Sequence, residues 1–226
     1  MSAIISTLDD AISYINSLYE FDSEVPTPGD EDFTVWTALL NIAKNIWATE
    51  EGVLWAELFV KLSDAATGDK TTSAGDYSYA CPTDFDFHAS AYVWLGSGNN
   101  KTPYKVISIE KLQLYENDGG NWCYFIRGAS PSLNFNPSLS IPASQTISYN
   151  YYKFASKLTT GADRLEMSDP MAAVFYAVGE LKKEEGDSSA LQVLSQKIEG
   201  MKTKNRMPTW LQTDDVFDGA ETGWGS

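Results

Sequence analysis

Residues 132–158 have the sequence SLNFNPSLSIPASQTISYNYYKFASKL. Ile147, Tyr149 and Tyr151 take every other position in it, which is the period of a β-strand with one buried face. A shorter apolar alternation begins at Leu133, and the prolines between the two runs cannot donate hydrogen bonds to a sheet. The pattern predicts two strands separated by a turn, and we expect them to pair as a β-hairpin.

Two amphipathic helices are predicted before this β-region. The first begins at Thr7, because Thr7 and Asp10 have the spacing of a capping box. The second covers about 33–51, with Gly52 placed to end it. The apolar positions at helical spacing are Leu8, Ala11, Ile12, Ile15, Leu18 and Tyr19 in the first helix and Trp36, Leu39, Leu40, Ala43, Ile46 and Trp47 in the second.

Two more helices are predicted after the β-region. Ser168-Asp169-Pro170 is a helix start with proline at the first helical position, and Ser188 caps a last helix after a break at Gly186-Asp187. The expected apolar stripes are Met171, Val174, Phe175, Val178 and Leu181, then Leu191, Leu194, Ile198 and Met201. Lys197, Lys202, Lys204 and Arg206 gather late in the last helix. They complement the helix dipole there, or they form a basic patch for nucleic acid.

The middle of the chain consists of short apolar runs separated by turn signals. Strands are expected near 77–81 and at 91–95, 103–109 and 122–126, whereas 53–62 fits a strand or a continuing helix. We therefore expect an α+β fold: a helical bundle from the N- and C-terminal helices with a central antiparallel β-sandwich or small barrel. The expected parts are the helices of 1–52, the β-region of 53–160, the helices of 161–206 packing with the first pair, and an extended tail at 207–226.

The chain of 226 residues has a formal net charge of -15, which disfavours a role in binding the phosphate groups of nucleic acid. Up to Glu57 the only basic residue is Lys44, so the exposed faces of the first helices are expected to be strongly negative. Two interpretations of this charge remain open. It keeps the protein soluble, or it lets nucleic acid pass without sticking.

Cys81 and Cys123 are the only cysteines, too few for a disulfide framework, and no CxxC or histidine neighbour indicates a zinc site. Reduced, buried thiols in a cytosolic setting are the expectation. The N-terminus has no basic leader region, and no apolar run approaches the roughly 18 residues of a membrane span. The sequence therefore predicts no membrane association and a protein made in a cytoplasm.

No pattern in the sequence indicates catalysis. His88 is the only histidine and has neither a Gly-x-Ser-x-Gly elbow nor an activated cysteine, so a structural or surface role is expected. Phosphate-binding glycine loops are absent from the sequence. Asp214, Asp215 and Asp218 match only part of a calcium loop. We expect no enzyme activity, no catalytic residues, no cofactor and no metal.

The C-terminal tail, 207–226, has no helical or strand period but contains several large apolar side chains. Exposed tails are usually polar, so these residues are expected to dock on a partner or on the same subunit. The candidate partner-binding residues are Trp210, Leu211, Phe217 and Trp224.

A series of short motifs carries a resemblance to a known family. In chain order they are Trp-Ala-Glu-Leu at 55–58, then Tyr79, Pro82, Asp84 and Phe85, then Tyr-Lys-Val-Ile-Ser at 104–108, then Leu133, Phe135 and Pro137, then Ile147, Tyr149 and Tyr151, and Met-Ser-Asp-Pro at 167–170. Over roughly residues 5–206 this order resembles the head-to-tail adaptor (connector) proteins of short-tailed double-stranded DNA phages. The family usually has an arginine-rich second helix, which this chain lacks, and its tail after Arg206 does not map onto the family.

The resemblance implies a structural virion protein of the neck or tail, assembled in the host cytoplasm. Such proteins form a ring, dodecameric in the family, that binds below the portal protein and docks the next tail or nozzle protein. Genomic DNA passes through the ring without specific binding. Two alternatives remain: another tail ring or nozzle-type component, and a carbohydrate-binding β-module, which flat exposed aromatic rings on one sheet face would favour.

Overall fold

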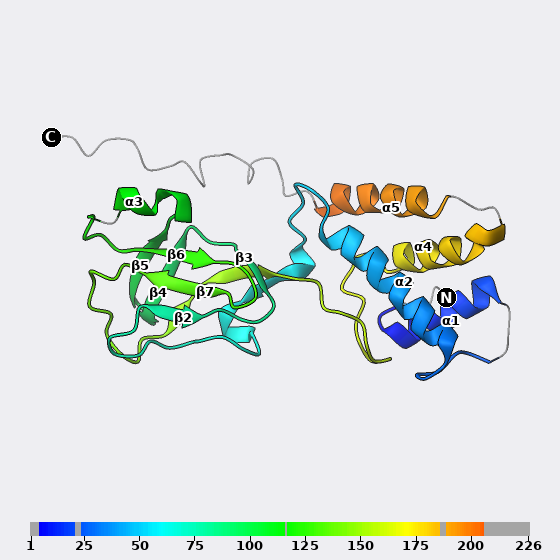
Figure 1. Cartoon of the computed structure of the whole chain (residues 1–226), viewed down its shortest axis with the longest axis horizontal. Helices are drawn as coiled ribbons and strands as arrows, with labels where there is room; N and C mark the ends of the chain where they lie inside the picture. Colours follow the sequence, from blue (N-terminus) through cyan, green and yellow to red (C-terminus); the bar gives the residue numbers. More distant parts are fainter. Residues whose placement is uncertain (1–4, 21–23, 116, 186–188, 206–226) are drawn as a thin grey trace. The chain divides into compact units, whose positions relative to one another are not determined.

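The computed structural model describes residues 5–20, 24–115, 117–185 and 189–205, and Figure 1 labels α1–α5 and β2–β7. The described chain folds into two compact units. We call residues 5–57 and 155–205 the helical unit, and residues 58–154 the β-unit. The mixed α+β class expected from the sequence is thereby confirmed.

The helical unit is organised around α4. Its helices are α1 (Leu8–Tyr19), α2 (Glu31–Ala48), α4 (Met171–Leu181) and α5 (Ala190–Asn205). Helix α4 packs against α1, α2 and α5 (Figure 1), so Ala172, Ala173 and Ala177 are fully buried together with the expected Val174. The apolar side chains of the N-terminal and C-terminal helices therefore share one core.

The start of α1 is confirmed as a capping box. The Thr7 hydroxyl accepts a hydrogen bond from the Asp10 amide, and the Asp10 carboxylate accepts one from the Thr7 amide at 3.0 Å. Ser6 also donates to this carboxylate through its amide. These bonds lower the pKa of Asp10, the Ser6 amide contributing most.

The prediction of buried positions in the helices is wrong for some residues. Phe175 and Leu191 are exposed, because α4 and α5 bury other faces in their mutual contact, where Gly179 lies against Ala190. Leu39 and Ile46 of α2 are only half-buried. Helix α2 also ends at Ala48, before the expected end of the segment 33–51.

The β-unit contains two sheets. The three-stranded sheet has the order β1-β9-β3, with bounds Phe59–Lys61, Asn150–Lys153 and Phe85–His88. The six-stranded sheet has the order β2-β7-β6-β5-β4-β8, with bounds Ser78–Ala80, Ser132–Phe135, Trp122–Ile126, Asn100–Val106, Tyr92–Ser97 and Ile147–Ser148. The short helical turns η1 (Ala56–Leu58), η2 (Leu62–Asp64), η3 (Ile109–Lys111), α3 (Leu112–Tyr115) and η4 (Lys182–Glu185) complete the described elements of the chain.

The expectation of a purely antiparallel β-region is wrong. Strands β5 and β6 pair in parallel, with Lys105 opposite Trp122 and Val106 opposite Cys123. A parallel pair needs a connection that returns the chain to the starting end of the sheet. The η3 and α3 turns lie in that connection.

The expected hairpin at 132–158 is also wrong. Strand β7 pairs with β2 and β6, whereas β8 pairs with β4 and β9 pairs with β1 and β3. The apolar alternation itself is confirmed, since Ile147, Tyr149 and Tyr151 are all buried. Between β8 and β9 the chain passes from one sheet to the other at Tyr149, whose carbonyl accepts a hydrogen bond from the Leu62 amide.

The two sheets share one aromatic core. The Phe85 ring stacks on Phe125 at 5.2 Å between ring centroids and contacts Tyr149 and Tyr151. Cys81 and Cys123 are free thiols buried in this cluster, as expected. Burial raises the pKa of Cys81 to about 11 and raises that of Cys123 further, so both thiols stay protonated and unreactive at neutral pH.

Candidate interaction sites

The outward face of the six-stranded sheet is the first candidate site. Val93 and Leu95 of β4 point into the core, so the alternating residues Tyr92 and Trp94 point outward. They are 41% and 39% exposed, and their ring centroids lie 6.2 Å apart with the planes tilted by 48°. We call the outward residues of β2, β7, β6, β5, β4 and β8 the outer sheet face.

The strand register places two lysines beside these rings. Lys105 lies opposite Tyr92, Pro103 opposite Trp94, and Lys101 opposite Gly96. Residues directly opposite in an antiparallel pair point to the same side of the sheet. Within the described residues neither Lys101 nor Lys105 forms an ion pair.

The outer sheet face carries no carboxylate at its strand positions. These positions are Ser78, Ala80, Ser132, Asn134, Trp122, Tyr124, Ile126, Lys101, Pro103, Lys105, Tyr92, Trp94, Gly96 and Ser148. Toward β6 the face is partly covered, since Tyr115 of α3 contacts the buried Trp122 ring. The open part, around β4 and β5, therefore combines aromatic surface with uncompensated positive charge.

A second candidate is a hollow of about 290 Å³ in the β-unit. Phe85, Val106 and Phe125 line it, and the His88 ring stacks on Phe125 with 5.1 Å between centroids. Desolvation of this ring, with the Arg127 charge second, lowers the pKa of His88 below its ordinary value of 6.5. Arg127 lies over the Phe87 ring and is 3.7 Å from the Asp86 carboxylate. Ser108 also lines the hollow, but the interactions found for the His88 ring are the stack on Phe125 and the nearby Arg127 charge.

A third candidate is an apolar stripe on the exposed side of α2. Val35 and Ile42 are 41% and 46% exposed, and the half-buried Leu39 and Ile46 continue the same line. The spacing of four, three and four residues keeps all four side chains on one side of a helix. We call these residues the α2 outer stripe. Since Trp36, Leu40, Ala43 and Trp47 face the core, α2 has two separate apolar faces.

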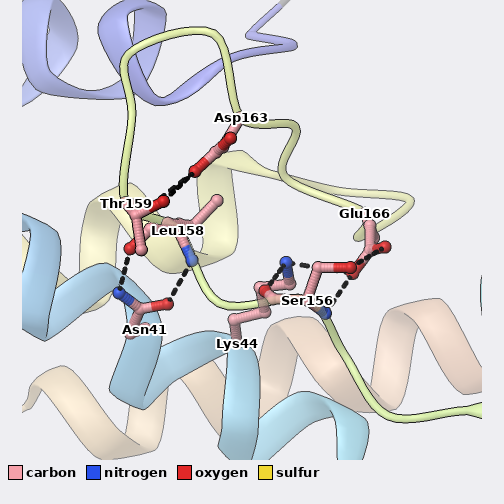
Figure 2. Close-up of polar contacts among 7 residues, drawn as sticks. All are labelled: Asn41, Lys44, Ser156, Leu158, Thr159, Asp163 and Glu166. Atoms are coloured by element: carbon pink, nitrogen blue, oxygen red, sulfur yellow. Dashed lines mark hydrogen bonds and ion pairs between the residues drawn. The ribbon is translucent and has the colours of Figure 1, made fainter. Parts of the chain in front are cut away.

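A polar cluster in the helical unit joins α2 to the returning chain (Figure 2). The Lys44 side chain is buried, donates to the Ser156 carbonyl and lies 3.0 Å from the Glu166 carboxylate. Asn41 accepts from the Leu158 amide at 2.9 Å and donates to the Leu158 carbonyl at 3.0 Å. These contacts join α2 to the returning chain, which indicates a structural role: they hold the segment 155–167 on α2.

Glu166 and Asp163 complete this cluster from the returning chain. Glu166 accepts bonds from both the amide and the hydroxyl of Ser156, so the carboxylate paired with Lys44 is also held in place (Figure 2). Asp163 accepts from the amides and hydroxyls of Thr159 and Thr160. These bonds, the Thr160 amide first, hold the pKa of Asp163 far below its ordinary value of 3.8.

The residues that the sequence singled out for binding have mixed outcomes. Trp210, Leu211, Phe217 and Trp224 lie outside the described residues. Of the late basic residues, Lys197 pairs with Asp169, and Lys202 pairs with Glu50 and Glu199. Both are therefore partly neutralised, which weakens the nucleic-acid interpretation of this patch.

Sequence reasoning did not single out Tyr92, Trp94 or the α2 outer stripe. The sequence did contain a signal for Tyr92 and Trp94, since these two aromatic residues alternate with Val93 and Leu95 in one strand. Alternation along a single strand does not show which face of the sheet is covered, however, because that depends on how the whole sheet packs. For α2, the two apolar faces adjoin one another on the helix, so the sequence pattern merged them.

Comparison with known proteins identifies no relative. No family model matches the chain, and no curated protein matches it either.

In the described part of the chain, no helix is both long and apolar enough to span a bilayer. The same residues contain no group of three or more histidine, cysteine or acidic side chains arranged to hold a metal ion.

Proposed function

We propose that this chain is a non-catalytic head-to-tail adaptor of a short-tailed double-stranded DNA phage. It forms a ring, a dodecamer by the family resemblance, below the portal protein, and it docks the next tail or nozzle protein while DNA passes through. We also propose the finer architecture expected from the sequence, in which the helices form a bundle and the strands form a small β-sandwich or barrel. The virion neck or tail is its proposed location.

The observation that carries the proposal is the division into two units with separate cores and separate exposed apolar surfaces. The helical unit offers the α2 outer stripe, and the β-unit offers the outer sheet face. A protein that connects two partners, and also contacts its own copies, needs several such surfaces on one chain.

The acidity of the first helices supports the passage of DNA. Residues 1–57 contain eleven Asp or Glu and a single basic residue, Lys44, whose charge is buried against Glu166. The exposed charged side chains among the described residues of this segment are thus all acidic. Such a surface repels phosphate, so a channel lined by it would let DNA slide without binding.

Mass photometry of the purified protein, alone and with the portal protein from the same genome, tests the proposal. We expect a discrete ring mass and a stable complex with the portal ring. Ile42→Asp should abolish or strongly reduce ring formation, because it puts a charge in the middle of the α2 outer stripe. Asn45→Asp is the matched control, an exposed polar position on the same helix that is not part of the stripe.

A protein that stays strictly monomeric and never binds the portal would contradict the adaptor function. A protein that forms rings but binds only other tail proteins would favour the nozzle-type alternative. Its position in a map of the virion would then separate the two structural roles.

A second candidate function, a carbohydrate-binding β-module, is favoured by one specific observation. Tyr92 and Trp94 are exposed side by side on a sheet face, and aromatic rings of this kind can pack against sugars. Their planes are tilted by 48°, so they form two facets rather than one flat platform. A glycan array tests this function. Binding that is lost in Trp94→Ala would support it, and no binding by the wild-type protein would exclude it.

A further inference from the structure

The outer sheet face has the composition of a binding surface for an acidic, aromatic peptide. Its open part presents the Tyr92 and Trp94 rings, Pro103, and the ammonium groups of Lys101 and Lys105. Interfaces of stable complexes are enriched in aromatic side chains at their centre, with charged groups at the rim. Because no strand position of this face is acidic, a partner with carboxylates meets attraction and no repulsion there.

The chain itself contains a segment of matching chemistry. Residues 207–226 include Asp214, Asp215, Asp218 and Glu221 and no Lys or Arg. The large apolar residues of the same segment are Trp210, Leu211, Val216, Phe217 and Trp224. Both the aromatic and the charged parts of the outer sheet face therefore have counterparts in one stretch of twenty residues.

Electrostatics also favours this contact between two copies of the chain. Each copy has a formal net charge of -15, so copies repel one another unless their contact pairs acids with cations. Residues 1–57 cannot supply the cations, because Lys44 is their only basic residue and is buried. Lys101 and Lys105 can, since neither forms an ion pair within the described residues.

We propose that residues 207–226 of one copy dock on the outer sheet face of a second copy, with aromatic side chains against Tyr92 and Trp94 and carboxylates against Lys101 and Lys105. This inference rests on the proposed function insofar as the copies must associate, and it names the contact that ties them together. An extended segment of this length reaches about 60–70 Å, which is ample for a neighbouring subunit.

Photo-crosslinking in the full-length protein tests the contact. Phe217 is replaced by p-benzoylphenylalanine, and equal amounts of ¹⁵N-labelled and unlabelled chains are mixed under dissociating conditions, reassembled and irradiated. We expect mixed-isotope cross-links from position 217 to peptides that contain residues 92–105. The same photo-crosslinker at Phe59, an exposed residue of β1 in the other sheet of the β-unit, is the positional control and should not give those cross-links.

Charge reversal then tests the chemistry of the contact. Lys101→Glu with Lys105→Glu should lower the yield of mixed-isotope cross-links on the order of tenfold, because two attractive contacts become repulsive. Lys61→Glu is the matched control, an exposed lysine on β1 in the other sheet, and should leave the yield unchanged.

Mass photometry of the same samples separates the two proposals. Rings that bind the portal but show no cross-link to residues 92–105 would overturn the tail contact and leave the adaptor function standing. Mixed-isotope cross-links in a protein that neither forms rings nor binds the portal would support the contact and contradict the adaptor function. Cross-links confined to the same chain, to the helical unit or to the portal would overturn the inference.

Discussion

The N-terminal part of the helical unit and the β-unit differ sharply in charge. Residues 1–57 carry eleven acids against one buried lysine, whereas residues 58–154 carry eight acids and seven basic residues. The overall charge of -15 therefore describes neither region well. Repulsion of phosphate is a property of the first helices, and the nearly neutral β-unit is free to bind acidic partners.

The two units also hold their cores together by different means. The β-unit packs Phe85 among three other aromatic rings in a core shared by both sheets. The helical unit also buries the rings of Trp36, Trp47 and Trp55, but it adds the small residues along α4 and the Lys44–Glu166 ion pair. A core of rings loses stability through cavities, whereas a buried ion pair loses it through an uncompensated charge. Substitutions in each unit test this difference.

The largest effect is expected for Phe85→Ala in the β-unit. Removing this buried ring leaves a cavity and deletes its contacts with Phe125, Tyr149 and Tyr151, which should lower the free energy of unfolding by about 3–5 kcal/mol. Urea unfolding followed by circular dichroism measures it. Trp94→Ala is the control, because a ring on the outer sheet face should change stability by only about 0.5 kcal/mol. Similar losses for the two variants would show that Trp94 belongs to the core.

Lys44→Ala should have the next largest effect, in the helical unit. It leaves the Glu166 carboxylate without its cation and the Ser156 carbonyl without a donor, and we expect a loss of about 3 kcal/mol. Lys44→Met combined with Glu166→Gln removes both charges and should recover part of this loss. The exposed Lys157→Ala is the control. If the double variant is as unstable as Lys44→Ala, packing of the lysine stem rather than its charge determines the effect.

The difference between the units also explains what the sequence could predict. Local signals were sufficient for the capping box at Thr7 and for the burial alternation of Ile147, Tyr149 and Tyr151. Local signals were not sufficient to predict which strands pair, because β7, β8 and β9 pair with strands far away in the chain. Which lysine lies beside which ring on the outer sheet face depends on that long-range register, so this site could not be assembled from the sequence.

The exposed apolar positions follow the same logic. The sequence pattern placed Phe175 and Leu191 in core stripes, but the order in which α1, α2 and α5 surround α4 decides which residues face outward. Lys44 was counted only as the single cation of the acidic region. Its burial follows from Ser156 and Glu166, which are more than a hundred residues away in the chain.

A smaller effect is expected at the two helix starts of the helical unit. Thr7→Ala removes the side-chain cap of α1 and should cost about 1 kcal/mol. Asp30 precedes α2, but its carboxylate accepts hydrogen bonds from Thr27 rather than from the helix, so Asp30→Ala should affect the capping of α2 little and act mainly on the preceding turn. Thermal unfolding of both variants measures the difference. Equal losses would mean that the turn at Thr27 stabilises α2 as much as a capping box stabilises α1.

The smallest expected effect is a difference in pH response between the units. The pKa of His88 is lowered in the folded β-unit, so its contribution to stability is present above the ordinary value of 6.5 and is lost as pH falls toward the folded pKa. The pKa of Asp10 is also lowered, and the contribution of the helical unit's capping box is lost only when pH falls below the ordinary value of 3.8.

Between pH 6.5 and pH 3.8, of these two groups only His88 makes the free energy of unfolding depend on pH. The free energy of unfolding, measured from pH 7.5 to pH 5, should therefore fall in the wild type and in Asp10→Asn but flatten in His88→Gln. The groups facing His88 are Phe125, Arg127 and, through Arg127, Asp86. Arg127→Gln removes the second cause of the shift and should reduce the slope without abolishing it, since desolvation against Phe125 remains. A slope unchanged in His88→Gln would assign the pH response to another group.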